Sequence, residues 1–361
     1  MSVAAASADT RAVQVNQRIR RVLAMHFDAD HGTPFWLDRE RSLGLDARED
    51  VRTVEDLPLL GIMTPADLSG RPLQNFVPRR FHSDMAGWIL GQTGGTTGGG
   101  VWTAYRPDEF AEAFITPFTR AAAHVGFPAG EQWLYVGPSG PHVIGKVVRE
   151  LAASMGSHDP FSVDFDARWA KRLTEGSFAM ERYLAHVIDQ AMGIIASQEI
   201  GVIFTTPAVL SALAAALSPE HKLRIRGLHY GGMEVTPATL VSMQTEHFPN
   251  AVHLSGYGNT LFGCCLELDV SPGRRPEYFP LGARLLLQVV DRQGCSTTPG
   301  DEGAVCVTRL DESFLIVRML ERDAATLVPP PEHAPPGFIL PGVRTPHSPL
   351  SLAPQQAKGL Y

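Results

Sequence analysis

A segment rich in glycine and threonine carries the sharpest chemical signal in the sequence. Residues 92–100, QTGGTTGGG, hold five glycines and three threonines in nine positions. Glycine lets the backbone approach a ligand closely, and consecutive N–H groups form a concave site for an anion. The segment lacks the Gly-Lys-Ser/Thr ending of a Walker A loop and the GxGxxG spacing of a dinucleotide fingerprint. We interpret it as an anion-binding loop; the alternative is a surface hairpin without a ligand.

Three further motifs follow this loop along the chain. They are YGGME at residues 230–234, GYGNT at residues 256–260, and Arg318 followed by Asp323 after four intervening residues. In this order the four motifs resemble those of the adenylate-forming superfamily, in the branch of phenylacetate–CoA ligases and luminescence acyl-protein synthetases. Residues 138–142 (PSGPH) and 206–207 (TP) fit the same branch, and the resemblance covers residues 30 to 325.

The resemblance implies a site for ATP. The glycine-rich loop would cradle the β- and γ-phosphates through Thr93, Gly94, Gly95, Thr96, Thr97 and Gly98. The second motif would flank adenine through Gly231, Gly232, Met233 and Glu234. In the third motif Tyr257 would stack on adenine and Thr260 would meet the α-phosphate, with Gly258 and Asn259 between them. Asp323, preceded by Arg318, would hold the ribose hydroxyls; taken alone, Asp323 reads equally as a surface carboxylate.

The expected reaction is ATP-dependent activation of a carboxylic acid. A carboxylate oxygen attacks the α-phosphorus and pyrophosphate leaves, so two anions must approach each other. Mg²⁺, loop N–H groups and hydroxyls would offset that repulsion. Thr96 and Thr260 are therefore the first candidate catalytic residues. The acyl group would then pass to a thiol or amine on CoA, on a carrier protein or on a small molecule, in a specialised biosynthetic pathway.

The resemblance to the phenylacetate branch favours an aromatic acid. Gly232 and Gly256 leave room for a flat ring, although either glycine could serve only the backbone. His142, between Pro141 and Val143, is a candidate contact to the substrate carboxylate; the alternative is a buried histidine with a backbone partner.

Three departures separate this chain from the family pattern. Gly99 and Gly100 stand where a proline and a lysine or threonine are usual, and Leu261 replaces the glutamate that helps to hold Mg²⁺. Glu234 or Glu267 is a possible replacement. From this sequence we expect no counterpart of the family's C-terminal domain, which supplies a lysine, after Asp323. Lys358 is the remaining candidate for that lysine, or is a solvated terminal side chain.

Two other functions stay open. One is a nucleotide-binding scaffold that has lost catalysis, consistent with Leu261. The other is a nucleotidyltransferase that adenylylates a hydroxyl group. Acyl transfer to Cys264 or Cys265, which follow the third motif closely, is a variant of the ligase interpretation.

The elements that position these motifs alternate along the chain. Helical patterns at residues 145–155, 183–197, 207–217 and 237–248 alternate with short apolar runs at 133–136, 201–204 and 227–230. This alternation predicts an α/β fold whose sheet is largely parallel. Residues 11–27 and 107–125 read as amphipathic helices. Residues 284–290 and 303–308 read as antiparallel strands of a smaller β-rich subdomain.

We predict three regions from these patterns. An α/β AMP-binding body with two subdomains covers residues 1–260, and the β-rich, barrel-like subdomain covers 261–328. Residues 329–361 form an extended tail, because nine prolines between Pro329 and Pro354 disfavour regular helix.

Composition excludes several classes. The chain has 361 residues, 44% hydrophobic, and a net charge of −7, which disfavours nucleic acid as a partner. Its four cysteines form no CxxC pair, the N-terminus has no basic signal-peptide region, and no apolar run is long enough to span a membrane. We expect a cytoplasmic protein that acts on a small carboxylic acid.

Overall fold

The computed structural model describes residues 3–93, 100–170, 172–174, 176–232, 236–298 and 300–348. It divides into two compact units. The first unit comprises Met1–Ala113 and Phe279–Val343, and the second comprises Phe114–Tyr278 and Arg344–Tyr361. These units interleave along the chain, whereas the regions 1–260, 261–328 and 329–361 are consecutive. That division into regions stays a prediction.

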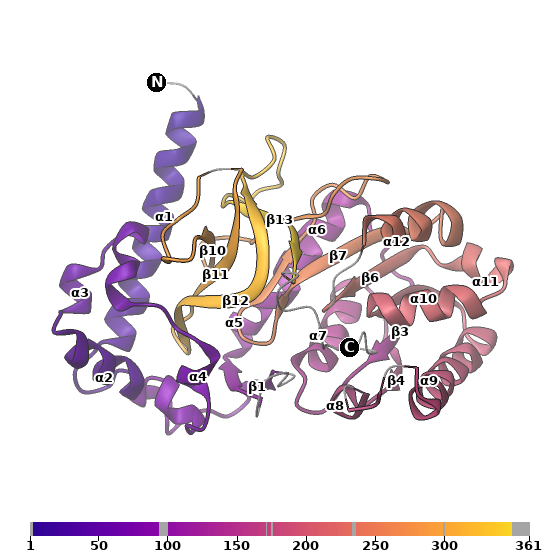
Figure 1. Ribbon diagram of the computed structural model, residues 1–361, viewed down its shortest axis with the longest axis horizontal. Coiled ribbons are helices and arrows are strands. Elements are labelled where there is room, and N and C mark those ends of the chain that lie inside the picture. Colours follow the sequence, from indigo (N-terminus) through magenta and orange to yellow (C-terminus); the bar gives the residue numbers. More distant parts are fainter. Residues whose placement is uncertain are drawn as a thin grey trace. The chain divides into compact units, whose positions relative to one another are not determined.

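The second unit is built on a six-stranded sheet (Figure 1). Its order is β4-β3-β5-β6-β7-β8, parallel from β4 to β7 and antiparallel between β7 and β8. The strands are β3 (Gln132–Gly137), β4 (Phe161–Asp164), β5 (Ile200–Thr205), β6 (Gly227–Gly231), β7 (Val252–Asn259) and β8 (Gly263–Leu266). The α/β class and the largely parallel sheet predicted from the sequence are confirmed.

Helices connect these strands, and polar side chains cap several of them. Thr206 and Ser218 each accept a hydrogen bond from a first-turn N–H, and a proline follows each of them at the first helical position. The helices of this unit are α6 (Thr116–Val125), α7 (Val143–Ser154), α8 (Ala167–Ala170), α9 (Phe178–Ser197), α10 (Pro207–Ala216), α11 (Pro219–Arg224) and α12 (Pro237–Ser242).

Two predicted helices each contain a π-helical turn. The helix expected at residues 107–125 consists of α5 (Pro107–Phe110), a π turn (Ala111–Ile115) and α6. Pro117 near the start of α6 has no N–H to donate to the preceding turn, which accounts for the local widening. The helix expected at 237–248 likewise ends in a π turn, Met243–His247.

The two faces of the parallel sheet bury different residues. On one face Leu134, Ile203 and Leu228 pack with α9 and α10 in an aliphatic core. On the other, His229 lies between the rings of Phe118 and Phe204, with centroids 4.8 and 4.4 Å away. This alternation is the two-residue period of a strand with both faces buried.

The first unit combines N-terminal helices with an antiparallel ladder. The predicted buried face of its first helix is confirmed, since Val15, Ile19, Val22, Leu23 and His26 are buried. Its helical segments are α1 (Val3–His26), α2 (Pro34–Leu43), α3 (Ala47–Asp50), α4 (Pro65–Leu68) and α5, with 3₁₀ turns at Val54–Leu60, Leu73–Phe76 and Arg79–Phe81. Its strands are the hairpin β1 (Ile89–Gln92) and β2 (Trp102–Tyr105), and the ladder β10 (Leu285–Val290), β11 (Glu302–Leu310) and β12 (Leu315–Val328).

Two short strands lie where the chain passes between the units: β9 (Glu277–Tyr278) and β13 (Gly342–His347). The strand β13 falls inside the region expected to be an extended tail. Residues 349–361 lie outside the described residues.

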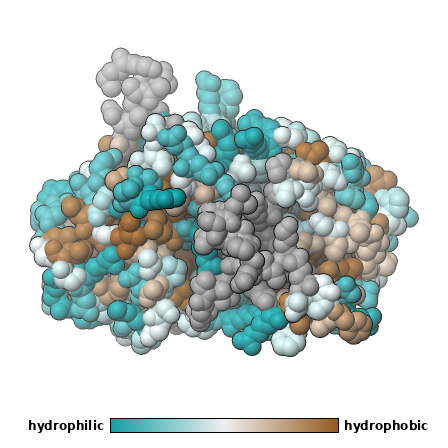
Figure 2. All heavy atoms as spheres, viewed as in Figure 1, coloured by the Kyte–Doolittle hydropathy of each residue, from teal (hydrophilic) through white to brown (hydrophobic). Residues whose placement is uncertain are grey.

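The described surface is mixed in character. On the face seen in Figure 2, hydrophobic residues form small areas between hydrophilic ones. Large apolar side chains that are exposed include Trp102, Trp169 and Phe178, and scattered exposure of this kind is ordinary for folded proteins. Among the described helices, none has the length and apolar character needed to cross a bilayer.

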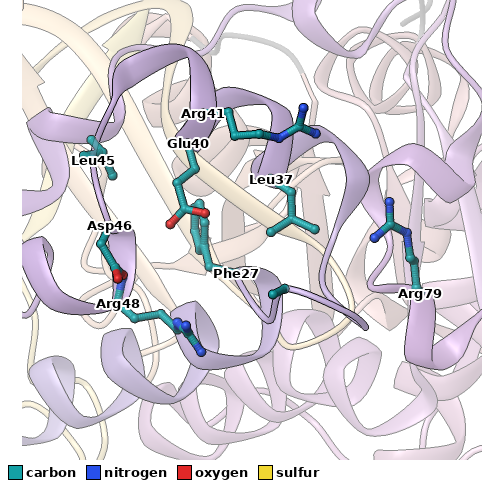
Figure 3. Close-up of a pocket in the computed structure, with 9 residues that line it drawn as sticks. Phe27, Leu37, Glu40, Arg41, Leu45, Asp46, Arg48 and Arg79 are labelled. Atoms are coloured by element: carbon teal, nitrogen blue, oxygen red, sulfur yellow. The ribbon is translucent and has the colours of Figure 1, made fainter.

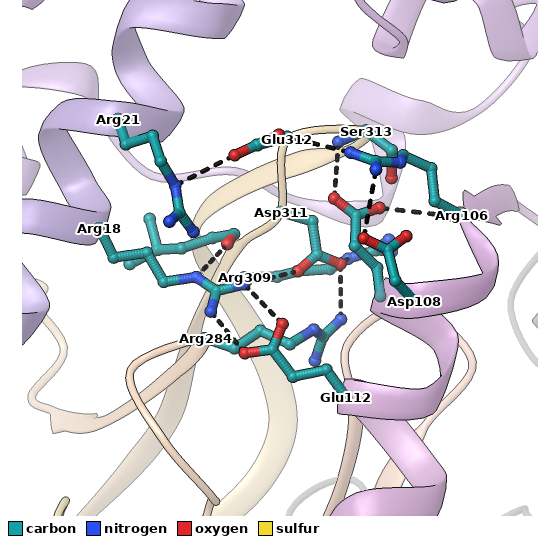
Figure 4. A network of polar contacts seen from close by, with 12 residues as sticks. Arg18, Arg21, Arg106, Asp108, Glu112, Arg284, Arg309, Asp311, Glu312 and Ser313 are labelled. Atoms are coloured by element: carbon teal, nitrogen blue, oxygen red, sulfur yellow. Dashed lines mark hydrogen bonds and ion pairs between the residues drawn. The ribbon is translucent and has the colours of Figure 1, made fainter.

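A buried ion-pair network stabilises the first unit (Figure 4). The carboxylate of Asp311, at the β11–β12 turn, accepts hydrogen bonds from Arg284 at 2.7 Å and from Arg309 at 2.6 Å. Burial alone would raise the pKa of Asp311, but the two guanidinium groups lower it below its ordinary value. Arg309 also lies 3.8 Å from the ring centroid of Tyr105. The network thereby joins the ladder to β2 and to α1, whose His26 contacts the Asp311 carbonyl.

This network predicts a large effect of one substitution. Asp311→Ala leaves Arg284 and Arg309 buried without their carboxylate, so the free energy of unfolding in urea should fall by about 3–5 kcal/mol. The control is Glu49→Ala, which breaks an exposed pair with Arg52 and should change stability by less than about 1 kcal/mol. Equal effects of the two substitutions would contradict the role of Asp311.

Candidate functional site

Parallel strands bring the predicted motifs of the second unit to one edge of its sheet. Val136, Thr205, Tyr230 and Ser255 are register partners across β3, β5, β6 and β7. The next residue on each strand or just beyond it is Gly137, Thr206, Gly231 and Gly256. The motifs at 138–142, 206–207, 231–232 and 256–260 therefore meet at the carboxyl edge. Ligands of open α/β sheets bind at such edges.

Two glycines of this edge lie directly opposite each other. Gly231 pairs with Gly256, and a Cβ atom on Gly231 would lie 2.8 Å from the Gly256 carbonyl oxygen. A Cβ on Gly256 would lie 3.4 Å from Cε1 of His229, and Gly232 adopts a φ of +80°. Close backbone packing therefore requires glycine at Gly231, and backbone conformation favours it at Gly232.

Tyr257 belongs to a group of aromatic rings at the end of β7. Its ring centroid lies 6.2 Å from that of Phe262 and 5.9 Å from that of Tyr278, with the Tyr278 ring tilted by 37°. Asn259 accepts a hydrogen bond from the N–H of Leu261 at 2.8 Å, which shapes the turn around the half-buried Thr260. Leu261 itself is buried, so this turn places an apolar side chain at the position where the motif resemblance leads us to expect a glutamate.

A buried polar set lies beside these rings. One carboxylate oxygen of Glu267 accepts hydrogen bonds from the N–H of Ser255 at 3.0 Å and from its hydroxyl at 2.5 Å. The same hydroxyl lies 2.9 Å from the hydroxyl of Tyr278. Glu267 is 6% exposed, and burial raises its pKa to about 7, although the Ser255 hydrogen bonds oppose the rise. Glu267 thus faces Ser255, and it titrates near neutrality.

The loop after β3 is held at three points. The Tyr135 hydroxyl donates to the Pro138 carbonyl at 2.8 Å. Asp164, at the end of β4, accepts from the Ser139 N–H at 2.8 Å and from its hydroxyl at 2.6 Å, and the His142 N–H donates to the Ser139 carbonyl at 3.2 Å. His142 is consequently fixed and buried immediately before α7.

Three predicted residues belong to the first unit. Thr93 lies at the base of the β1–β2 hairpin, where its hydroxyl accepts from the Val101 N–H at 3.1 Å. Arg318 and Asp323 lie on β12. Arg318 has a positive φ of 48°, and its guanidinium group donates to the Gly294 carbonyl. Arg318 therefore anchors the β10–β11 turn, while Asp323 is half-buried farther along the strand.

The remaining predicted residues lie outside the described part of the chain. They are Gly94, Gly95, Thr96, Thr97 and Gly98 of the glycine-rich loop, Met233 and Glu234 of the second motif, and Lys358. Among the described residues, no cluster of three or more His, Cys, Asp or Glu side chains could hold a metal ion.

Sequence reasoning did not assign a role to three of the residues found here. Asp164 and Tyr278 carry no motif. The parallel register of β4 with β3 brings Asp164 to the loop after β3, and a tertiary ring contact brings Tyr278 to Tyr257. Ser255 immediately precedes the third motif, and the two-residue strand period places it on the same face as Tyr257.

The first unit holds a separate pocket of about 360 Å³ (Figure 3). It contains no predicted site residue; its lining is Phe27, Ala29, Leu37, Glu40, Arg41, Leu45, Asp46, Arg48 and Arg79. Glu40 accepts from the Ala47 N–H and Asp46 caps α3, so both carboxylates serve local structure.

The raised pKa of Glu267 predicts a pH-dependent stability. A carboxyl group with a higher pKa in the folded state stabilises the fold when protonated, and this contribution is lost as the pH rises from 4.5 through about 7. In Glu267→Gln the side chain is neutral at every pH. The unfolding free energy of the wild type minus that of this variant should therefore fall by roughly 3 kcal/mol over this window. If this difference in unfolding free energy, measured in urea, does not change with pH, the burial of a titrating Glu267 is contradicted. The control is Glu246→Gln, on the exposed surface.

Comparisons with known proteins establish the fold. No family model and no curated protein matches the sequence. Among solved structures, 2-hydroxyisobutyryl-CoA ligase in complex with 2-HIB-AMP and CoA matches 94% of this chain and 68% of its own length, at 15% identity and a TM-score of 0.66. The same ligase in its postadenylation state with R3-HIB-AMP matches 94% and 67%, at 15% identity and a TM-score of 0.64. This chain therefore shares the fold of 2-hydroxyisobutyryl-CoA ligase and spans about two thirds of that ligase's length.

Proposed function

Starting from the fold of an adenylate-forming ligase, we propose that this protein activates a carboxylic acid with ATP. A carboxylate oxygen of the acid forms a bond to the α-phosphorus. The bond from that phosphorus to the pyrophosphate oxygen breaks, and its electron pair leaves with pyrophosphate. The resulting acyl-adenylate then gives its acyl group to a thiol or amine, and AMP is released.

The observation that carries this proposal is the carboxyl edge of the parallel sheet. There the backbone of Gly231 and Gly256, the ring of Tyr257 and the hydroxyl of Thr260 come from segments that strand register brings together. A flat base fits beside a ring such as Tyr257, and the hydroxyl of Thr260 suits a phosphate oxygen. We assign ATP to this edge.

The motif resemblance alone assigns further ATP contacts, to residues of the first unit. Asp323 would accept hydrogen bonds from the ribose hydroxyls, a charge-assisted interaction. Thr93 forms the base of the loop that would hold the β- and γ-phosphates, and Arg318 positions β12 through Gly294. Mg²⁺ would enter with ATP and neutralise part of the phosphate charge.

We propose an aromatic acid as substrate and CoA or a carrier protein as acceptor, with a small amine as the other choice. His142 is the proposed substrate contact, because four hydrogen bonds hold its loop in place and it lies buried immediately before α7. Preorganisation of this kind favours binding, since little conformational freedom is lost when the substrate enters.

Pyrophosphate release tests the proposal. ATP, Mg²⁺ and a panel of aromatic and aliphatic acids are supplied with hydroxylamine as the acyl trap, and release should depend on the acid. Asp323→Ala and Thr96→Ala each remove contacts to ATP and should lower kcat/KM by about 10- to 100-fold, corresponding to lost hydrogen bonds to charged groups. Asp189→Ala and Thr245→Ala, at exposed helical positions, are the matched controls.

A second candidate function is nucleotide binding without catalysis. The buried Leu261 favours it, because the turn after Thr260 then lacks a carboxylate for the metal. Under this alternative ATP binds and Asp323→Ala weakens binding, but no acid in the panel releases pyrophosphate. Acid-dependent release excludes it.

A further inference from the structure

The hydrogen-bonded set Glu267–Ser255–Tyr278 ends at the ring proposed to stack on adenine. We propose that Ser255, Glu267 and Tyr278 are positioning residues that fix Tyr257 for stacking on the adenine base and so raise the affinity for ATP. This inference rests on the proposed function, because it assigns the base-recognition step of the same nucleotide site.

The geometry forms a continuous path. Glu267 accepts from Ser255, and the Ser255 hydroxyl also contacts the Tyr278 hydroxyl at 2.9 Å. The Tyr278 ring then lies 5.9 Å from the Tyr257 ring, within the distance range of interacting aromatic pairs. Removal of the Ser255 hydroxyl would therefore take away a contact that holds Tyr278. Because Tyr278 packs beside Tyr257, the Tyr257 ring would then be less firmly positioned.

Strand geometry places the side chains of Ser255, Tyr257 and Tyr230 on one side of the sheet. Ser255 and Tyr257 are two residues apart on β7, so their side chains share a face. Tyr230 is the register partner of Ser255 on β6, which puts its side chain on that face too. The set thus lies immediately inside the carboxyl edge, next to the proposed site and not elsewhere in the core.

Burial of these polar groups lowers the stability of the fold, so we expect them to serve a function. Burial of Glu267 disfavours its charged form, and the Tyr230 hydroxyl, also buried, has no hydrogen-bond partner among the described residues. Burial and the nearby Glu267 raise the pKa of Tyr230 well above its ordinary value, so this hydroxyl stays protonated. Apolar side chains of similar volume would avoid these penalties. Positioning of the stacking ring supplies a reason for polar residues here.

Direct nucleotide binding to the purified full chain tests this inference without knowledge of the acid. Calorimetric dissociation constants for ATP are measured on the wild type, Ser255→Ala, Tyr278→Phe and Ser255→Thr. The loss of one hydrogen bond in Ser255→Ala or Tyr278→Phe should weaken ATP binding roughly three- to tenfold. Ser255→Thr keeps the hydroxyl and should bind ATP as the wild type does.

Two matched substitutions serve as controls. Ser211→Ala removes a hydroxyl that donates to a carbonyl within α10, and Tyr183→Phe removes one that accepts from the Asp166 N–H. Both residues lie away from β7, so both substitutions should leave the dissociation constant for ATP unchanged. They report any general effect of removing a part-buried hydroxyl.

Each other outcome has a distinct meaning. Wild-type binding of ATP with no change in Ser255→Ala overturns the positioning role and leaves the proposed function intact. A loss of affinity in Ser255→Ala that Ser255→Thr shows to the same extent also overturns it. A wild type that binds no ATP contradicts the proposed function itself, and the inference with it.

Discussion

The parallel pairing of β3, β5, β6 and β7 is the constraint on which the second unit depends. Because the strands run in one direction, segments far apart in the sequence end at the same edge of the sheet. The pairing is close enough that a side chain on Gly231 would collide with the Gly256 carbonyl. The same contact that closes the sheet therefore leaves bare backbone at the edge, where a planar ligand can approach.

Buried polar groups stabilise the two units in different ways. In the first unit Asp311 is paired with two guanidinium groups, so its charge is satisfied within the protein. In the second, Glu267 receives only neutral donors, and its pKa rises to about 7. A charge balanced by two opposite charges serves the fold, whereas a carboxyl group poised near neutrality beside an aromatic edge is typical of functional sites.

The sequence predicted the helices α7, α9 and α10 and the strands β3, β5, β6, β10 and β11, because hydrophobic period and proline-capped starts are local signals. It did not predict β7 and β8 as strands, since Gly256 and Gly258 read as a loop until β6 and β8 supply their hydrogen bonds. The motif residues Tyr257 and Thr260 could be selected by resemblance. Asp164 and Tyr278 could not, because only tertiary contacts bring them to the site. The π turns could not be predicted either, because hydrophobic periodicity does not distinguish a π turn from an α-helical one.

The central claim is that a carboxylate oxygen attacks the α-phosphorus of ATP at this edge. The most direct test supplies the acid labelled with ¹⁸O in both carboxylate oxygens, together with ATP, Mg²⁺ and hydroxylamine, and measures the mass of the AMP released. The account predicts AMP that carries one ¹⁸O atom, because the bridging oxygen of the acyl-adenylate leaves with AMP. Unlabelled AMP, or ADP as the nucleotide product, would contradict it.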